Sequence, residues 1–205
     1  MKDFSQLSDK QTIDKTIEAL KKNGIDAKFV ETGEEAKKEV FSLIPDGSEV
    51  MTMSSVTLDS LGIPKEVQES GKYDSVKNKL SSMDKETQGL DMQRLGAAPE
   101  WTVGSVHAVT EDGHVFIASN TGSQLPAYAS GASHVIWVVG TQKIVKDDTE
   151  ALERIYEYVL PLESVRLNKA YNITVGSFVS KLLILNREIN KGRITMLFVN
   201  EKLGF

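Results

Sequence analysis

The chain of 205 residues has a hydrophobic fraction of 40% and a formal charge of −5 at pH 7, which suits one sizeable core. It contains no cysteine, so disulfides, thiolate zinc sites, cysteine-held iron–sulfur clusters and a cysteine nucleophile are excluded. Its lysines are not clustered as nucleic-acid binding requires. Its opening residues lack the apolar stretch and small-residue cleavage site typical of a secretory signal, and no apolar run reaches about 18 residues. We therefore expect a cytoplasmic protein that carries no cofactor of its own and binds neither nucleic acid nor membranes.

The N-terminal part predicts two helices with a strand between them. Ser8 and Gln11 have capping-box spacing ahead of a helix that stops at Asn23. Thr32 and Glu35 repeat this spacing before a second helix, which a Pro-Asp-Gly run breaks. The predicted elements are helices at 8–23 and 32–44 and strands at 25–30 and 49–53. We interpret residues 1–48 as an N-terminal segment of a single domain, 1–205, with its core at 49–205.

The middle of the chain predicts outer helices and then a hairpin. Residues 63–92 are charged and weakly periodic, which indicates helices on the outside of the domain or a lid. Strands at 103–110 and 114–118 flank Asp112 and Gly113, a typical hairpin turn. If that turn has two residues, His107 lies opposite Ala118.

The last part predicts a strand, a helix and two further strands. An apolar strand at 135–139 contains Trp137, which we assign to the core. Asp147 or Asp148 caps a helix that buries a face and ends at Pro161. That face consists of Leu152, Ile155, Tyr156 and Val159. Strands at 181–185 and 194–199 are joined by a polar connector that suits a hairpin or a crossing loop. The alternation of helices and strands favours an α/β fold, with an open, mostly parallel sheet flanked by helices, an inserted antiparallel hairpin and the N-terminal helical segment.

Small polar residues follow three of these strands. In an open α/β sheet, ligands bind at the carboxyl ends of the strands. Gly122 allows a positive φ that could turn successive N–H groups toward an anion, and Lys143 adds a positive charge. The predicted ligand-binding residues are Ser54, Ser55, Thr57, Ser119, Asn120, Thr121, Gly122, Ser123, Gln124, Thr141, Gln142 and Lys143. The alternative is that they are ordinary turn residues beside a solvated lysine.

The other polar candidates favour structural roles. His107 and His114 are separated by about 13 Å of strand, too far to share an ion, and we assign no metal site. His134 opens a strand and is also interpreted as structural. Four further residues could bind a carboxylate but are more typical of surface pairs: Arg166, Asn172, Arg187 and Arg193.

Several motifs together resemble one family. They lie at 55–58, 61–63, 109–113, 118–124, 139–145, 160–163, 192–195 and 199–205, and the Gly-Thr-Gln-Lys-Ile-Val string from Gly140 is the most specific. They are similar to those of the lactate-utilisation, or LUD-domain, family. The resemblance implies a fold like that of pentose-phosphate isomerases, glucosamine-phosphate deaminases and CoA-transferases. It also implies a part in the oxidation of L-lactate to pyruvate, beside iron–sulfur subunits.

The resemblance also raises the question of a glutamate nucleophile, which CoA-transferases use. Glu111, Glu163 and Glu188 have family-like surroundings, but each suits a turn, a cap or an ion pair, and we assign no catalytic residue.

Three functions stay open. The first is an accessory subunit that binds a small anionic molecule in the utilisation of L-lactate, or another 2-hydroxy acid, to pyruvate. Its partners would be iron–sulfur lactate-oxidation subunits or a second copy of the chain. The second is an independent enzyme that acts on a phosphorylated or CoA-linked metabolite. The third is a regulatory sensor that binds a ligand without turnover.

Overall fold

A computed structural model describes residues 2–171 and 176–205 of the chain. The strands within these residues are β1 Asp26–Val30, β2 Glu49–Thr52, β3 Asp74–Ser75, β4 Trp101–Gly104, β5 Ala108–Thr110, β6 Val115–Ser119, β7 His134–Gly140, β8 Ile144–Val145, β9 Lys181–Leu185 and β10 Ile194–Val199. The α-helices are α1 Lys10–Lys22, α2 Gly33–Leu43, α3 Val56–Ser60, α4 Ile63–Glu69, α5 Val76–Ser82, α6 Lys85–Ala97, α7 Asp148–Glu153 and α8 Leu160–Tyr171. Shorter turns are the π-helical η1 Ala127–Gly131 and η3 Arg154–Val159 and the 3₁₀ turn η2 Thr141–Lys143.

The strands form two sheets. The first, which we call the parallel sheet, has the order β1-β10-β7-β4-β2-β3, and its neighbouring strands all run parallel. The second sheet has the order β8-β5-β6-β9 and contains the antiparallel hairpin of β5 and β6. β7 lies inside the parallel sheet and is almost continuously buried, as expected for a strand covered on both faces. The predicted α/β fold with a mostly parallel sheet is therefore confirmed.

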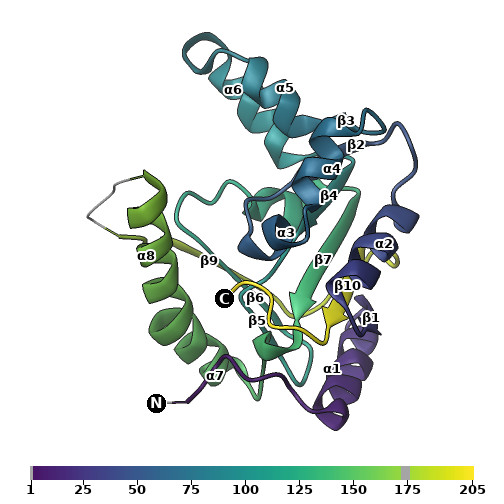
Figure 1. Cartoon of the computed structure of the whole chain (residues 1–205), viewed down its shortest axis with the longest axis vertical. Coiled ribbons are helices and arrows are strands. Elements are labelled where there is room, and N and C mark those ends of the chain that lie inside the picture. The colour runs from purple at the N-terminus through teal and green to yellow at the C-terminus, as the bar shows by residue number, and fades with distance from the viewer. Residues whose placement is uncertain (1, 172–175) are drawn as a thin grey trace.

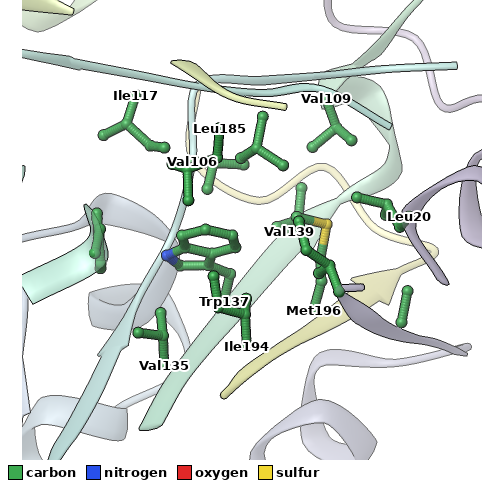
Figure 2. Close-up of a cluster of buried hydrophobic side chains, with 14 of the residues drawn as sticks. Leu20, Val106, Val109, Ile117, Val135, Trp137, Val139, Leu185, Ile194 and Met196 are labelled. Atoms are coloured by element: carbon green, nitrogen blue, oxygen red, sulfur yellow. The ribbon is translucent and has the colours of Figure 1, made fainter. Parts of the chain in front are cut away.

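The main hydrophobic core lies between the two sheets. Trp137 of β7 is fully buried, and its ring meets that of Tyr128 edge-on, with 5.4 Å between the centroids. Figure 2 shows Trp137 between Ile194 of the parallel sheet and Ile117 of the second sheet, which belong to the same cluster. The prediction that Trp137 fills the core is confirmed.

The first helix is capped one residue later than predicted. The Asp9 carboxylate accepts a hydrogen bond from the Thr12 N–H at 2.8 Å, whereas the Ser8 hydroxyl donates to the carbonyl of Thr141. Ser8 is thus used in a tertiary contact, and the neighbouring carboxylate satisfies the helix N-terminus. At the second helix the predicted cap is confirmed, because Thr32 Oγ1 accepts from the Glu35 N–H at 3.2 Å.

The predicted strand at 103–110 is two strands in two different sheets. β4 ends at Gly104 in the parallel sheet, and β5 begins at Ala108 in the second sheet. The hairpin turn has three residues rather than two, since the Thr110 N–H donates to the His114 carbonyl and Gly113 has a φ of +87°. A glycine in this conformation is typical of three-residue loops. The register therefore pairs Ala108 with Phe116, and the predicted pairing of His107 with Ala118 is wrong.

The helix that Asp147 caps does not end at Pro161. It runs from α7 through η3 into α8. Pro161 therefore lies inside this continuous helix, shortly after the i→i+5 turns of η3, where the regular i→i+4 hydrogen-bond pattern is already interrupted. Leu152 and Tyr156, predicted to be buried, are 37% and 47% exposed, while Arg154 is fully buried.

The remaining segments connect or flank the sheets. The connector after β9 leads from the second sheet to the parallel sheet, so it is a crossing loop. α5 and α6 extend together at the top of the molecule in Figure 1, and α6 has no buried residue, which agrees with helices on the outside. Among the described residues, none of the helices combines the length and the apolarity that crossing a bilayer requires.

Candidate ligand-binding site

A cavity of about 330 Å³ opens where β2, β4, β6 and β7 end. Its polar lining comes from the segments that follow these strands, from α8 and from the residues around Gly204. The polar side chains that line it are Ser54, Ser55, Thr57, Asp59, Ser105, His107, Ser119, Asn120, Thr121, Ser123, Gln124, Tyr128, Lys143, Glu163, Arg166 and Ser177. Its volume and its mixed polar and apolar wall are typical of a small-molecule site.

The structure brings together nine of the twelve residues predicted to bind a ligand. Those that line the cavity are Ser54, Ser55, Thr57, Ser119, Asn120, Thr121, Ser123, Gln124 and Lys143. Gly122, Thr141 and Gln142 are not among the lining residues. The polar ends of distant strands therefore share one cavity, and binding by these residues remains a prediction.

The loop after β6 uses its own hydroxyls to satisfy its backbone. Gly122 has the expected positive φ, +86°, but its N–H donates to Ser119 Oγ at 2.8 Å. The Ser123 N–H donates to Thr121 Oγ1. These two N–H groups are bonded within the loop, so the loop presents mainly side chains, rather than an N–H concavity, to the cavity.

Gln142 holds the C-terminal segment against the cavity wall, whereas the buried Thr141 hydroxyl has no hydrogen-bond partner among the described residues. Both are buried, and Gln142 Nε2 donates to the carbonyl of Leu203 at 3.0 Å. The Thr57 hydroxyl donates to the same carbonyl at 3.1 Å. Gly140 permits this approach, because a Cβ at that position would lie 2.5 Å from the carbonyl oxygen of Glu201.

Lys143 is the most unusual residue of the cavity. It is 3% exposed, and its Nζ donates to Thr57 Oγ1 at 3.2 Å, Ser105 Oγ at 3.2 Å and the Val106 carbonyl at 3.1 Å. In the described part of the chain, no carboxylate lies within 4.0 Å of this nitrogen. Burial lowers the pKa of Lys143 to about 7, and repulsion by the Arg154 guanidinium contributes. An ammonium that is buried without a counter-ion favours a bound anion.

A second buried cation, Arg154, lies near enough to Lys143 to repel its positive charge. Arg154 is fully buried, and its Nη1 donates to the carbonyl of His107. Its Nε and Nη2 atoms have no hydrogen-bond partner within residues 2–171 and 176–205, and the guanidinium lies 5.3 Å from the ring centre of Tyr158. Burial lowers the pKa of Arg154 to about 10, so it stays charged at neutral pH. Sequence reasoning missed Arg154, although its spacing from Ala151 could have placed it on the buried helix face.

His107 lines the cavity as a neutral imidazole. Its Nδ1 accepts a hydrogen bond from the Ala118 N–H at 3.1 Å, which leaves the ring proton on Nε2. Burial lowers the pKa of His107 to about 3, with further repulsion from Lys143 and Arg154. Sequence reasoning treated this histidine as structural and did not place it beside a ligand site. It also missed Ser105 and Tyr128, which the ends of β4 and η1 bring to the cavity.

The other histidines lie outside the cavity lining. His134 stacks on Trp101 with 4.1 Å between ring centroids. His114 Nδ1 is 2.8 Å from Asp148 Oδ1, and these residues with Asp112 form a group whose ligand atoms lie within 4.8 Å of one another.

The three glutamates are all paired. Glu163 binds Arg166 through both oxygens, at 2.7 and 2.6 Å, and both residues line the cavity. Glu111 pairs with Lys15 at the hairpin, and Glu188 pairs with Arg193 in the interior. The predicted pairing of Glu188 with Arg193 and a pairing of Glu163 are therefore observed, but the expectation that Arg193 belongs to a surface pair is wrong, because Arg193 is buried. Arg187 is exposed, and Asn172 lies outside the described residues.

Comparison with known proteins gives one family match and several similar solved structures. A model of the LUD domain matches residues 13–199. A solved structure of a DUF162 family protein from Deinococcus radiodurans aligns with a TM-score of 0.58 and 11% identity, over 95% of this chain and 99% of that chain. The beta subunit of eIF2B from Chaetomium thermophilum aligns with a TM-score of 0.38 and 11% identity, over 58% of this chain and 44% of that chain. Comparison with curated proteins gives no match.

Proposed function

The chain belongs to the LUD-domain family, and we propose that it is the accessory, small-molecule-binding subunit of a cytoplasmic system that oxidises L-lactate, or a related 2-hydroxy acid, to the 2-oxo acid. One observation carries this proposal. Lys143 is buried in the cavity wall, and no carboxylate within the described residues neutralises it. We infer that the carboxylate of the ligand is its counter-ion.

The size and chemistry of the cavity favour a small acid. A volume of about 330 Å³ is at the lower end of the range for ligand sites, which suits a short hydroxy acid better than a complete CoA ester. The hydroxyls of Ser54, Ser55 and Ser105 line the same space, and hydroxyls can bond both to a carboxylate and to a 2-hydroxyl or 2-oxo group. Arg154 adds positive potential from behind the wall.

The proposed partners are subunits that carry the electrons. The chain has no cysteine, so iron–sulfur ligation by cysteine would come from other chains. In this proposal the subunit holds the acid, and an iron–sulfur partner completes the redox reaction. Self-association of the chain is an alternative arrangement for the same role.

Calorimetric titration of the purified chain tests the proposal. L-lactate and pyruvate should bind, and Lys143→Met should weaken binding roughly tenfold or more because it removes a charged hydrogen-bond donor. Lys146→Met is the matched control, since Lys146 is an exposed lysine three residues away and should leave the affinity unchanged. Equal affinity in the Lys143→Met variant would contradict the proposal.

A second candidate is an enzyme that acts on a phosphorylated metabolite. The hydroxyl-rich loop after β6, with Ser119, Thr121 and Ser123, lines the cavity and offers donors to a phosphate. Under this alternative, a sugar phosphate or an acyl-CoA would bind more tightly than lactate and would be converted by the isolated chain.

A further inference from the structure

We propose that Lys143 is a nucleophile, and that its amine condenses with the carbonyl carbon of a 2-oxo acid in the cavity to form a reversible imine. The proposal rests on the proposed function for the class of ligand, and adds a covalent step at a named atom. Three features support it: the contacts of Nζ, the surroundings that disfavour its charge, and the cavity beside it.

The contacts of Nζ satisfy a neutral amine as well as an ammonium. The Thr57 hydroxyl already donates to the Leu203 carbonyl, so it can only accept from Lys143. The Val106 carbonyl also only accepts. A neutral amine has two N–H bonds, which these two acceptors use, and its lone pair then faces the third neighbour, the Ser105 hydroxyl, which can donate to it until a ligand carbonyl takes up both the lone pair and the hydroxyl proton.

The surroundings of Lys143 disfavour its ammonium form. The amine is withdrawn from water, and the Arg154 guanidinium repels a second positive charge; together these effects place the pKa of Lys143 near 7. Lysines that are desolvated beside another cation are a recurrent type of imine-forming nucleophile. With a pKa near 7, Lys143 is present both as the ammonium that pairs with a ligand carboxylate and as the free amine that attacks a 2-oxo carbon, in contrast to a solvated lysine.

The cavity places a ligand carbonyl within reach of this amine. Lys143 and all three of its hydrogen-bonding neighbours, Thr57, Ser105 and Val106, line the cavity. Gly204 lies against the same group, since a Cβ there would be 3.6 Å from Nζ and 2.6 Å from Thr57 Oγ1. Because Gly204 has no side chain, the C-terminal segment packs directly against Thr57 and Lys143 and forms this wall of the cavity.

The reaction balances without an oxidant or reductant. The Nζ lone pair attacks the 2-oxo carbon, the carbonyl electron pair moves to oxygen, and a proton passes from nitrogen to that oxygen to give a carbinolamine. The C–O bond then breaks, a second nitrogen proton leaves with the oxygen as water, and the C=N bond forms. The Ser105 hydroxyl, 3.2 Å from Nζ, is placed to donate a hydrogen bond to the oxygen that accepts the charge. L-lactate has no carbonyl at C2 and cannot react in this way.

Borohydride trapping with pyruvate tests the inference. The full chain is incubated with pyruvate near pH 7.5, reduced with sodium borohydride and analysed by intact mass and peptide mapping. We expect one reduced pyruvate adduct, located on Lys143, at a yield roughly tenfold or more above that on Lys146. Lactate in place of pyruvate, and omission of borohydride, should both give no adduct.

Variants and a binding measurement separate the two proposals. Lys143→Met should lose the adduct and Lys146→Met should keep it, while mapping of the unmodified chain gives the site even if Lys143→Met does not fold. Calorimetric binding of pyruvate without an adduct on Lys143 would overturn the imine and leave the proposed function standing. Neither binding nor an adduct would overturn both, and labelling spread over exposed lysines without preference for Lys143 would overturn the imine.

Discussion

The Lys143 amine and the Thr57 hydroxyl lie 3.2 Å apart, although 86 positions separate them in the sequence. Thr57 follows β2, Lys143 follows β7, and β4 lies between these two strands in the parallel sheet. The amine therefore reaches across the end of β4, where it also meets Ser105 and Val106. The order of the strands, rather than any local motif, assembles the positively charged wall of the cavity.

The buried amine should make the stability of the protein depend on pH between 7 and 10.5. The pKa of Lys143 falls from 10.5 to about 7 on folding, so the unfolded chain binds more protons within this window. The free energy of unfolding should rise with pH through the window, by up to about 1.4 kcal/mol per pH unit from this group. The contribution of Lys143 to stability should be lost as the pH falls from 10.5 toward 7.

Chemical unfolding at a series of pH values checks this prediction. Lys143→Met should remove the contribution of this amine to the pH dependence. The difference in unfolding free energy between the variant and the unmodified protein should therefore change steadily from pH 7 to pH 10.5. Lys146→Met, an exposed control, should run parallel to the unmodified protein. Parallel curves for Lys143→Met as well would contradict the buried amine.

The sequence predicts local features well when the chemistry is local. Thr32 lies three residues before the N–H group that it caps, and the spacing alone reveals this bond. The hydroxyls at the strand ends were predicted for a similar reason, because a parallel sheet aligns the carboxyl ends of its strands. Nine of these predicted residues line the cavity.

Features that depend on distant partners were missed. Arg154 lies on the same buried helix face as Ala151 and Ile155, but its partner, the carbonyl of His107, is 47 positions away, and the local sequence does not reveal that contact. The strand predicted at 103–110 is interrupted between Gly104 and Ala108 because β4 pairs in the parallel sheet and β5 pairs in the second sheet. The interruption also depends on the Tyr128 hydroxyl, which would lie 1.7 Å from a Cβ at Gly104. Neither relationship has a signal in the neighbouring sequence.

His107→Asn should remove part of the acid sensitivity of the protein. The pKa of His107 falls from 6.5 to about 3 on folding, so the unfolded chain binds more protons between these values. Stability from this group is complete above pH 6.5 and is lost as the pH falls toward 3. Asparagine keeps an acceptor for the Ala118 N–H but does not titrate.

The measurement is the free energy of unfolding from pH 4 to pH 7 for both proteins. The unmodified protein should lose stability more steeply on acidification, by up to about 1.4 kcal/mol per pH unit. An equal slope in the variant would show that His107 is not held neutral.

Gly204→Ala should weaken ligand binding more than it weakens the fold. Gly204 has a φ of +63°, and a Cβ there would lie 2.6 Å from Thr57 Oγ1, so the substitution would displace the wall beside Lys143. We expect a loss of about 1 to 2 kcal/mol in unfolding free energy from backbone strain, with a clear drop in pyruvate affinity.

Gly192→Ala is the matched control. It has a similar φ of +77°, but a Cβ would meet nothing within 4 Å, so it carries the strain without the contact. Calorimetry should show unchanged affinity for Gly192→Ala. Equal losses of pyruvate affinity in the two variants would mean that the loss comes from backbone strain and not from the contact between Gly204 and Thr57.

Arg154→Met should raise the pKa of Lys143. Burial is the larger cause of the lowered pKa, and repulsion by Arg154 is the second; only the second is removed by the variant. The readout is labelling of Lys143 by an amine-reactive ester, followed by mass spectrometry as a function of pH. The midpoint of labelling should move to higher pH, while labelling of Lys146 in the same samples should follow an unchanged profile. An unmoved midpoint for Lys143 would refute the electrostatic coupling.

The buried ion pair of Arg193 and Glu188 should be essential for the stability of the fold rather than for binding an anionic ligand. Arg193 is 7% exposed and donates to Glu188 at 2.6 Å and to the Tyr128 carbonyl at 2.8 Å, which anchors the turn that carries Tyr128. Arg193→Met leaves the Glu188 carboxylate buried without its partner, at an expected cost of about 3 to 5 kcal/mol. Arg94→Met is the control, because the pair with Asp91 is 70% and 66% exposed and should contribute less than about 1 kcal/mol. Urea unfolding of both variants measures the difference, and similar small losses would mean that Glu188 finds water or another donor when Arg193 is removed.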